Sequence, residues 1–99
     1  MYALFFHDLA LKEWRKLDSS IRDQFTKKLL ERLDCPRVEK DRVRGVADAY
    51  KIKLRTAGYR LVYTVHDETV RVYVIVVGKR EKSAVYKAMK GRTQKAGSS

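Results

Sequence analysis

Residues 50–63 constrain the fold of this chain more than any other stretch. They read YKIKLR (50–55), a short turn TAG (56–58), and YRLVY (59–63). Apolar and cationic residues alternate through the first arm, and a period of two places successive side chains on opposite faces of a β-strand. The stretch therefore predicts a β-hairpin with one apolar face that joins a core and one face that carries a row of cations.

The apolar pattern also predicts the register of this hairpin. Directly paired residues point to the same face of a sheet, and the apolar side chains agree only if Leu54 pairs with Tyr59. A shift by one residue would turn Lys51 and Lys53 toward the core, which their burial cost forbids. The remaining expected pairs are Ile52–Leu61, Tyr50–Tyr63, Lys53–Arg60 and Lys51–Val62.

A third strand is predicted at residues 69–77, because the run from Val70 to Val77 is nearly all apolar, as in a central strand covered on both faces. We interpret Asp67-Glu68 as a tight turn before it. The pairs expected from that turn are Val65–Val70, Leu61–Val74 and Arg60–Ile75. The chain then leaves the third strand at Lys79 and Arg80, close to the start of the second.

Cations from separate strands are thus expected to converge at one end of one sheet face. The converging residues are Lys51, Lys53, Arg60 and Arg80. Two of them, Lys51 and Lys53, should lie about 7 Å apart along one strand. A row of cations on a strand is commonly a solvated face, but this convergence favours a phosphate-binding site.

The rest of the chain predicts an α+β domain with the order β-α-α-β-β-β-α. We expect an antiparallel sheet that carries an N-terminal helical hairpin on one face. The strand is expected at 2–6, with helices at 9–17 and from about 20 to 35. A short C-terminal helix is expected to contain Val85, Tyr86 and Met89. One domain should span residues 1–90, followed by a basic, disordered tail at 91–99.

The charge balance indicates a polyanionic partner. The 99 residues include 23 Lys and Arg against 12 Asp and Glu, a formal net charge of +11, which for a small domain favours nucleic acid. The single cysteine and two distant histidines predict no disulfide, no metal site and no cofactor. No apolar run is long enough for a membrane span. We expect a cytoplasmic protein that does not contact a membrane.

At this point the residues resemble a known family, the RelE-type toxins of the RelE/ParE superfamily. The resemblance covers the chain from its first strand to about Met89. It is carried by five segments: ALKEWRKL (10–17), Arg44-Gly45, YKIKLR (50–55), GYRLVY (58–63), and VGKRE (77–81) with Tyr86 beyond. The resemblance implies a RelE/ParE-like fold of the microbial RNase type.

The resemblance also implies a function: a toxin that cleaves mRNA in the ribosomal A site without a metal, by attack of the message's own 2′-hydroxyl to give a 2′,3′-cyclic phosphate. Lys51 would be the general base and Arg80 the general acid. Arg60 would stabilise the phosphorane-like charge, Lys53 would assist electrostatically, and Tyr86 would stack on a base. Three further cations, Arg44, Arg55 and Lys79, would contact RNA. Because cations around a lysine disfavour its charged form, such a site lowers the pKa of a lysine base.

The implied partners are the mRNA, the 70S ribosome with its 16S rRNA, and an acidic RelB-like antitoxin, with DNA reached only through the antitoxin. Two other readings stay open: a non-catalytic basic domain that binds RNA or DNA, and a gyrase-poisoning toxin of the ParE type. A relative with a His/Glu acid–base pair is disfavoured, because neither His7 nor His66 is expected at the cluster.

Overall fold

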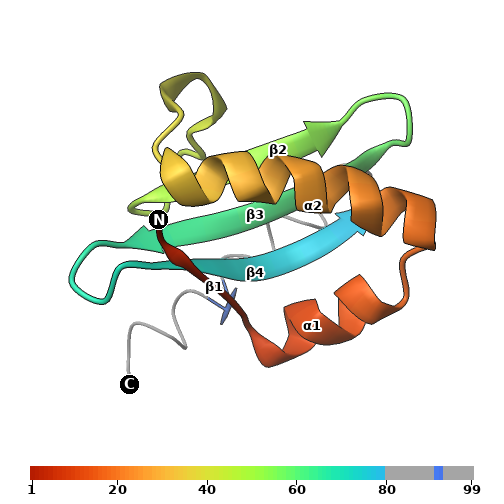
Figure 1. The fold of residues 1–99 in the computed structure, drawn as a ribbon, viewed down its shortest axis with the longest axis horizontal. Helices are drawn as coiled ribbons and strands as arrows, with labels where there is room; N and C mark the ends of the chain where they lie inside the picture. The colour runs from red at the N-terminus through yellow and green to blue at the C-terminus, as the bar shows by residue number, and fades with distance from the viewer. Residues whose placement is uncertain (80–90, 93–99) are drawn as a thin grey trace.

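The computed structural model describes residues 1–79 and 91–92, and it places two helices on one face of a four-stranded sheet. In chain order the elements are β1 (Ala3–Phe6), α1 (Asp8–Arg15), α2 (Ser19–Asp34), the 3₁₀ helix η1 (Glu39–Asp41), β2 (Ala49–Leu54), β3 (Tyr59–His66) and β4 (Arg71–Lys79). The strands lie in the order β1-β4-β3-β2, with α2 across β2 and β3 and α1 beside β4 (Figure 1). The α+β prediction is confirmed; the predicted C-terminal helix lies outside the described residues.

The main core fills the space between α2 and the sheet. On α2, the fully buried side chains recur at helical spacing, Phe25, Leu29 and Leu33, and they pack against the apolar residues of the hairpin. The apolar side chains that the sheet contributes are Tyr50, Ile52, Leu54, Leu61, Tyr63, Val65, Val72, Val74 and Val77. The predicted apolar face of residues 50–63 therefore does join the core, and it turns the intervening lysines to the other face.

The sequence pattern predicts Asp8 as the N-cap of the first helix and Leu30 as part of the apolar stripe of the second, and the structure differs at both positions. The N-cap of α1 is His7, whose Nδ1 accepts a hydrogen bond from the backbone N–H of Leu9 at 3.1 Å; Asp8 is the first helical residue. Leu30, expected to broaden the apolar stripe of α2, is 53% exposed. The stripe of α2 is therefore narrow, with one buried side chain per turn.

The sheet is mixed, which corrects the expectation of an antiparallel sheet. The strand β1 pairs parallel to β4, with Ala3 opposite Arg71 and Phe6 opposite Val74, while the other two strand pairs are antiparallel. The physical reason is the helical hairpin, since a connection through α1 and α2 carries the chain across the sheet and back. Within residues 1–79 and 91–92, no strand pairs with the other edge of β1.

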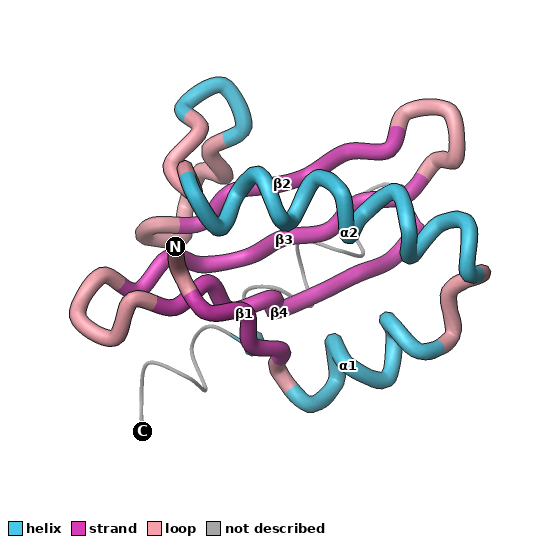
Figure 2. The backbone as a smooth tube through the Cα atoms, in the orientation of Figure 1, coloured by secondary structure: helices cyan, strands magenta, loops and turns pink. Residues whose placement is uncertain are grey.

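The register of the first hairpin is confirmed, but that of the second is wrong. The β2–β3 pairs are Leu54–Tyr59, Lys53–Arg60, Ile52–Leu61, Lys51–Val62 and Tyr50–Tyr63. Between β3 and β4 the observed pairs are Val65–Val72, Leu61–Val77 and Arg60–Gly78. The connecting loop is longer than two residues, because His66 pairs with Arg71 (Figure 2), and Val70 in it has a φ of 55°.

A β-bulge adds one more residue of shift in β4. Val62 pairs with Val76, whereas the next residue of β3, Tyr63, pairs with Val74. Ile75 is therefore the extra residue on β4. Beyond β1, the open edge of β4 is closed by side chains: Glu13 accepts from the N–H of Val77 at 3.1 Å, and Arg92 donates to the carbonyl of Ile75 at 2.8 Å.

Arg92 belongs to the tail predicted at 91–99, and its side chain forms hydrogen bonds with α1 and β4. Its guanidinium forms two hydrogen bonds with the Glu13 carboxylate, at 2.8 and 3.0 Å, and its side chain is 12% exposed. The chain therefore leaves β4 at Lys79 and lies beside the same strand again at Arg92. The predicted domain boundary at residue 90 otherwise falls outside the described residues.

Candidate functional site

The candidate site lies on the sheet face that α2 does not cover. Lys51 and Lys53 are half-buried there, because they alternate with the buried Tyr50, Ile52 and Leu54. A second, smaller apolar cluster forms the floor of this face: Val43, Val46, Ala49, Val62, Tyr73, Ile75 and Val76. Lys51 and Lys53 therefore lie on the same sheet face as a buried apolar cluster.

Lys53 and Arg60 are directly opposite each other on neighbouring strands. Ala49 and Lys51 both turn their carbonyls to the outer edge of β2, where these accept from Val43 and Arg32. Lys53 follows the same alternation, so its pair with Arg60 is of the kind without mutual backbone hydrogen bonds, in which the Cα atoms approach to about 4.5 Å. Like charges in direct opposition destabilise a sheet, and the charge of Arg60 contributes to the lowered pKa of Lys53.

The exit of β4 lies beside the same pair. Arg60 is opposite Gly78, and Tyr59 is opposite Lys79. The last residues of β4 therefore lie beside Arg60, where the predicted register would have placed Ile75. Arg80 and Tyr86 themselves lie outside the described residues.

Electrostatics at the cluster follow from mutual repulsion. The pKa of Lys53 is lowered from its ordinary value, first by the charge of Lys51, then by loss of solvation and by the charges of Arg60 and Arg55. Within residues 1–79 and 91–92, the ammonium groups of Lys51 and Lys53 form no ion pair with a carboxylate. An anion is the partner this arrangement suits.

The three predicted RNA-contacting cations are all exposed, but only two of them lie near Lys53 and Arg60. Arg55 directly follows β2, and its charge acts on Lys53. Lys79 ends β4 opposite Tyr59, next to Arg60. Arg44 is in the loop before β2, one residue after the buried Val43, and no described contact joins it to the lysines.

One important residue was missed by the sequence reasoning. Arg32 of α2 reaches over the outer edge of β2 and pairs with Asp41 of η1 at 2.6 Å. Both line a polar hollow of about 360 Å³ beside the site, together with Lys28, Lys40, Lys53 and Arg55. The only sequence signal is the place of Arg32 at the border of the buried stripe, three residues after Leu29.

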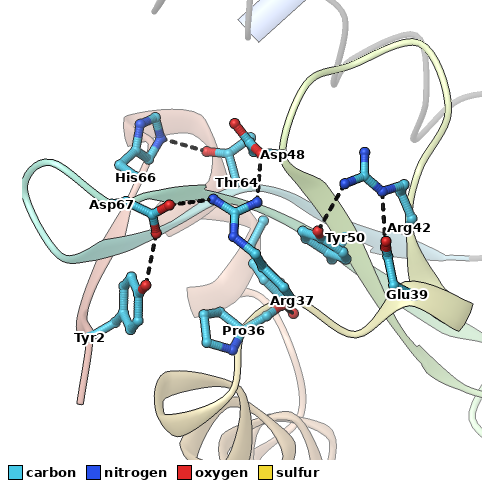
Figure 3. A network of polar contacts seen from close by, with 11 residues as sticks. Tyr2, Pro36, Arg37, Glu39, Arg42, Asp48, Tyr50, Thr64, His66 and Asp67 are labelled. Atoms are coloured by element: carbon cyan, nitrogen blue, oxygen red, sulfur yellow. Dashed lines mark hydrogen bonds and ion pairs between the residues drawn. The ribbon is translucent and has the colours of Figure 1, made fainter.

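At the other end of the sheet, charges are paired (Figure 3). Arg37 donates to Asp48 at 2.6 Å and to Asp67 at 2.8 Å, and Asp67 also accepts from the hydroxyl of Tyr2 at 2.8 Å. The two latter bonds hold the pKa of Asp67 below its usual value. His66 is at this end as expected, bonded to the hydroxyl of Thr64 at 2.8 Å.

Metal-binding groups and membrane-spanning helices are both absent from the described part of the chain. Residues 1–79 and 91–92 contain no group of three or more His, Cys, Asp and Glu side chains that could hold a metal ion. They also contain no helix with the length and apolar character of a membrane span.

Comparisons with known proteins identify the family of this chain. A family model described as the ParE toxin of type II toxin–antitoxin systems matches residues 4–84. The mRNA interferase toxin RelE of Escherichia coli is 61% identical over 85 residues, which cover 86% of this chain and 90% of that protein. The mRNA interferase RelE of Shigella flexneri matches to the same extent.

Solved structures give the same family. The free state of an arginine-to-alanine double mutant of E. coli RelE has a TM-score of 0.86 at 57% identity, covering 92% of this chain and 96% of that one. RelE in the intact E. coli RelBE toxin–antitoxin complex has a TM-score of 0.80 at 58% identity, covering 83% and 100%. This chain belongs to the RelE/ParE family of toxins from type II toxin–antitoxin systems.

Proposed function

We propose that the protein is the toxin of a type II toxin–antitoxin pair and an endoribonuclease that cleaves mRNA in the ribosomal A site and so inhibits translation. The observation that carries the proposal is the cluster of Lys51, Lys53 and Arg60, in which neither lysine has a carboxylate partner among the described residues. The curated relatives that share this chain's sequence are named mRNA interferases.

The reaction needs proton transfer and charge stabilisation at one phosphate. The base takes the proton of the 2′-hydroxyl, the 2′ oxygen forms a bond to phosphorus, and the bond to the 5′ oxygen breaks as that oxygen gains a proton. The products are a 2′,3′-cyclic phosphate and a 5′-hydroxyl. We assign the base to Lys51, with Lys53 beside it, and the protonation of the 5′ oxygen to Arg80.

The negative charge that develops on the phosphate meets fixed cations. Arg60 lies opposite Lys53 on the neighbouring strand, so two positive charges approach the phosphate from one side. Removing one such preorganised group costs typically about 10²–10³ in rate. Tyr86 is assigned to stacking on a base of the message, and Arg44, Arg55 and Lys79 to the RNA backbone.

The lowered pKa of Lys53 supports base chemistry at this cluster. A lysine ordinarily titrates near about 10.4, too high for an effective base at neutral pH. The lysine next to the proposed base has this pKa lowered, chiefly by the charge of Lys51. The charge of Lys51 therefore favours the neutral form of the lysine beside it.

Dependence on the ribosome fits a cluster of cations to which the described residues add no His/Glu acid–base pair. Positioning of two reacting groups can supply about 7–11 kcal/mol of a barrier, and the ribosome would supply it by fixing the message. Contacts to 16S rRNA suit the net charge of +11. Translation in bacteria occurs in the cytoplasm, which is the location we assign.

An acidic antitoxin of the RelB type is the expected protein partner. Relatives have been crystallised as RelBE toxin–antitoxin complexes, and an acidic segment over Lys51, Lys53 and Arg60 would neutralise the cluster and block the message. Contact with DNA would then occur only through the antitoxin.

The test is toeprinting on ribosomes programmed with a defined mRNA. We expect Lys51→Met to abolish cleavage and Lys27→Met, an equivalent change on the exposed side of α2, to leave it intact. Wild-type protein that binds ribosomes but leaves the message whole would overturn the proposal in favour of a non-catalytic binder. Trapped DNA breaks with gyrase and plasmid, without mRNA cleavage, would instead identify a ParE-type toxin.

A further inference from the structure

Arg32 is the most heavily engaged side chain near the candidate site. Its Nη1 donates to the hydroxyl of Tyr63 at 2.8 Å and to the main-chain carbonyl of Lys51 at 3.2 Å, and its Nη2 donates to Asp41 at 2.6 Å. The Arg32 and Asp41 side chains are only 14% and 20% exposed. One guanidinium therefore joins α2, η1, β2 and β3.

The carbonyl of Lys51 needs such a donor because β2 is an edge strand. It pairs with β3 along one edge, and along its other edge no strand of the described sheet pairs with it. The preceding outward carbonyl, that of Ala49, accepts from the N–H of Val43 at 2.9 Å. At Lys51 the guanidinium of Arg32 takes the place of the missing strand.

The guanidinium is itself held rigidly. Its partner Tyr63 is fully buried and donates its hydroxyl proton to the carbonyl of Pro36 at 2.6 Å. The guanidinium carbon also lies 5.8 Å from the centre of the Tyr63 ring, within the range of a cation–π contact. A planar fork fixed at several acceptors has little freedom to move.

We propose that Arg32 is a positioning residue for Lys51, acting through the main-chain carbonyl on the outer edge of β2. This inference rests on the proposed function, since it assumes that Lys51 acts on the 2′-hydroxyl. Arg32 touches no reacting atom; it fixes the backbone from which the lysine side chain extends.

The reason that this matters is the flexibility of lysine. The ammonium group of Lys51 has no ion-pair partner among the described residues, so only its backbone defines where its four-carbon stem begins. A displacement of about 1 Å at a reacting group can cost about 10²-fold in rate. An edge strand held on one side only would allow such displacements.

The test compares two variants that differ only at Arg32. Asp41→Asn removes the ion pair but leaves Arg32 on the Lys51 carbonyl. The double variant Arg32→Met with Asp41→Asn also removes the guanidinium and leaves no unpaired buried carboxylate. We expect kcat for cleavage on programmed ribosomes to fall about tenfold between these two variants, with KM for the ribosome unchanged.

A local readout accompanies the kinetics. The amide of Ile52 belongs to the same peptide group as the Lys51 carbonyl, so its NMR resonance reports whether that carbonyl is hydrogen-bonded. We expect this resonance to shift in the double variant and to stay in place in Asp41→Asn. Equal kcat values for the two variants, or a raised KM at unchanged kcat, would overturn the inference.

Two controls separate the possible failures. Arg37→Met removes a comparable double ion pair at the other end of the sheet and should leave kcat unchanged. Lys51→Met tests the proposed role of Lys51, and cleavage by the wild-type protein tests the proposed function. If the wild-type protein leaves the message whole, the proposed function fails; if Lys51→Met cleaves normally, the assignment of the base fails and the inference about Arg32 with it. If Lys51→Met is inactive while the double variant keeps the kcat of Asp41→Asn, only the role of Arg32 fails.

Discussion

The two ends of the sheet treat positive charge in opposite ways. At the end where β2 and β3 are joined through Gly58, Lys53 stands opposite Arg60 with another lysine beside it. At the other end, Arg37 bridges two aspartates, one before β2 and one in the loop after β3. Within the described residues, Lys51 and Lys53 repel each other and have no carboxylate partner, whereas Arg37 is neutralised by two aspartates.

This contrast separates charges that stabilise the fold, at the Arg37 end, from charges that we assign to function, at the Lys51 and Lys53 end. The Arg37 network joins the N-terminal segment, the loop before β2 and the β3–β4 loop through Tyr2, Asp48 and Asp67. Lys51 and Lys53 form no such ion pair with any described residue, and the charge of Lys51 lowers the pKa of Lys53. Variants at the two ends should therefore separate activity from stability.

The largest expected effect is on activity at the cationic end. Arg60→Met should lower kcat for A-site cleavage by about 10²–10³, the usual cost of one lost charge-stabilising group. Its midpoint of urea unfolding should not fall, because relief of the repulsion with Lys53 offsets the lost contacts of the side chain. Cleavage within tenfold of wild type would remove Arg60 from the mechanism.

A smaller and opposite effect is expected at the neutralised end. Arg37→Met should lower the free energy of unfolding by about 1 kcal/mol, since exposed ion pairs contribute about 0.2–1 kcal/mol each and Arg37 forms two. Urea titration followed by circular dichroism measures this loss. Unchanged stability would mean that the network is only a surface contact.

The pH dependence of stability should also differ between the ends, first on the acid side. The folded-state pKa of Asp67 is lowered by the hydrogen bonds from Tyr2 and Arg37. Its contribution is therefore complete above the ordinary aspartate pKa of about 3.9 and is lost as the pH falls through the lower folded value. The urea midpoints of wild type and Asp67→Asn should differ at pH 6 and converge toward pH 2.

The smallest expected effect is on the alkaline side and has the reverse sense. Because the pKa of Lys53 is lowered in the fold, its charged form destabilises the folded state below that pKa, and the penalty disappears as the pH rises to the ordinary value near about 10.4. Lys53→Met should thus have the higher urea midpoint at pH 7, with the gap closing by pH 10.5. Lys27→Met, on exposed α2, should show no such trend.

The first hairpin could be predicted residue by residue because burial decides it. The alternate pairs Tyr50–Tyr63, Ile52–Leu61 and Leu54–Tyr59 all place their side chains against the main core, and a shift by one would bury lysines. The second hairpin lacks this constraint, since β4 is apolar on both faces and tolerates other registers. The loop at residues 67–70 and the bulge at Ile75 were therefore invisible to the pattern.

The candidate site divides along the same line. Lys51, Lys53 and Arg60 could be placed from alternation alone, and the exit of β4 approximately. Arg32 could not, because its acceptors come from three distant segments and depend on how α2 lies across the sheet. The direction of β1 was likewise missed, since a four-residue strand carries no signal for parallel pairing.

The parallel pairing of β1 with β4 has a consequence for synthesis. The first strand to leave the ribosome pairs with the last strand of the sheet, and the same last strand places Gly78 opposite Arg60. Contacts between such distant segments form late in folding. A nascent chain therefore cannot complete its sheet, or the pairing that borders its cationic site, until β4 has left the ribosome.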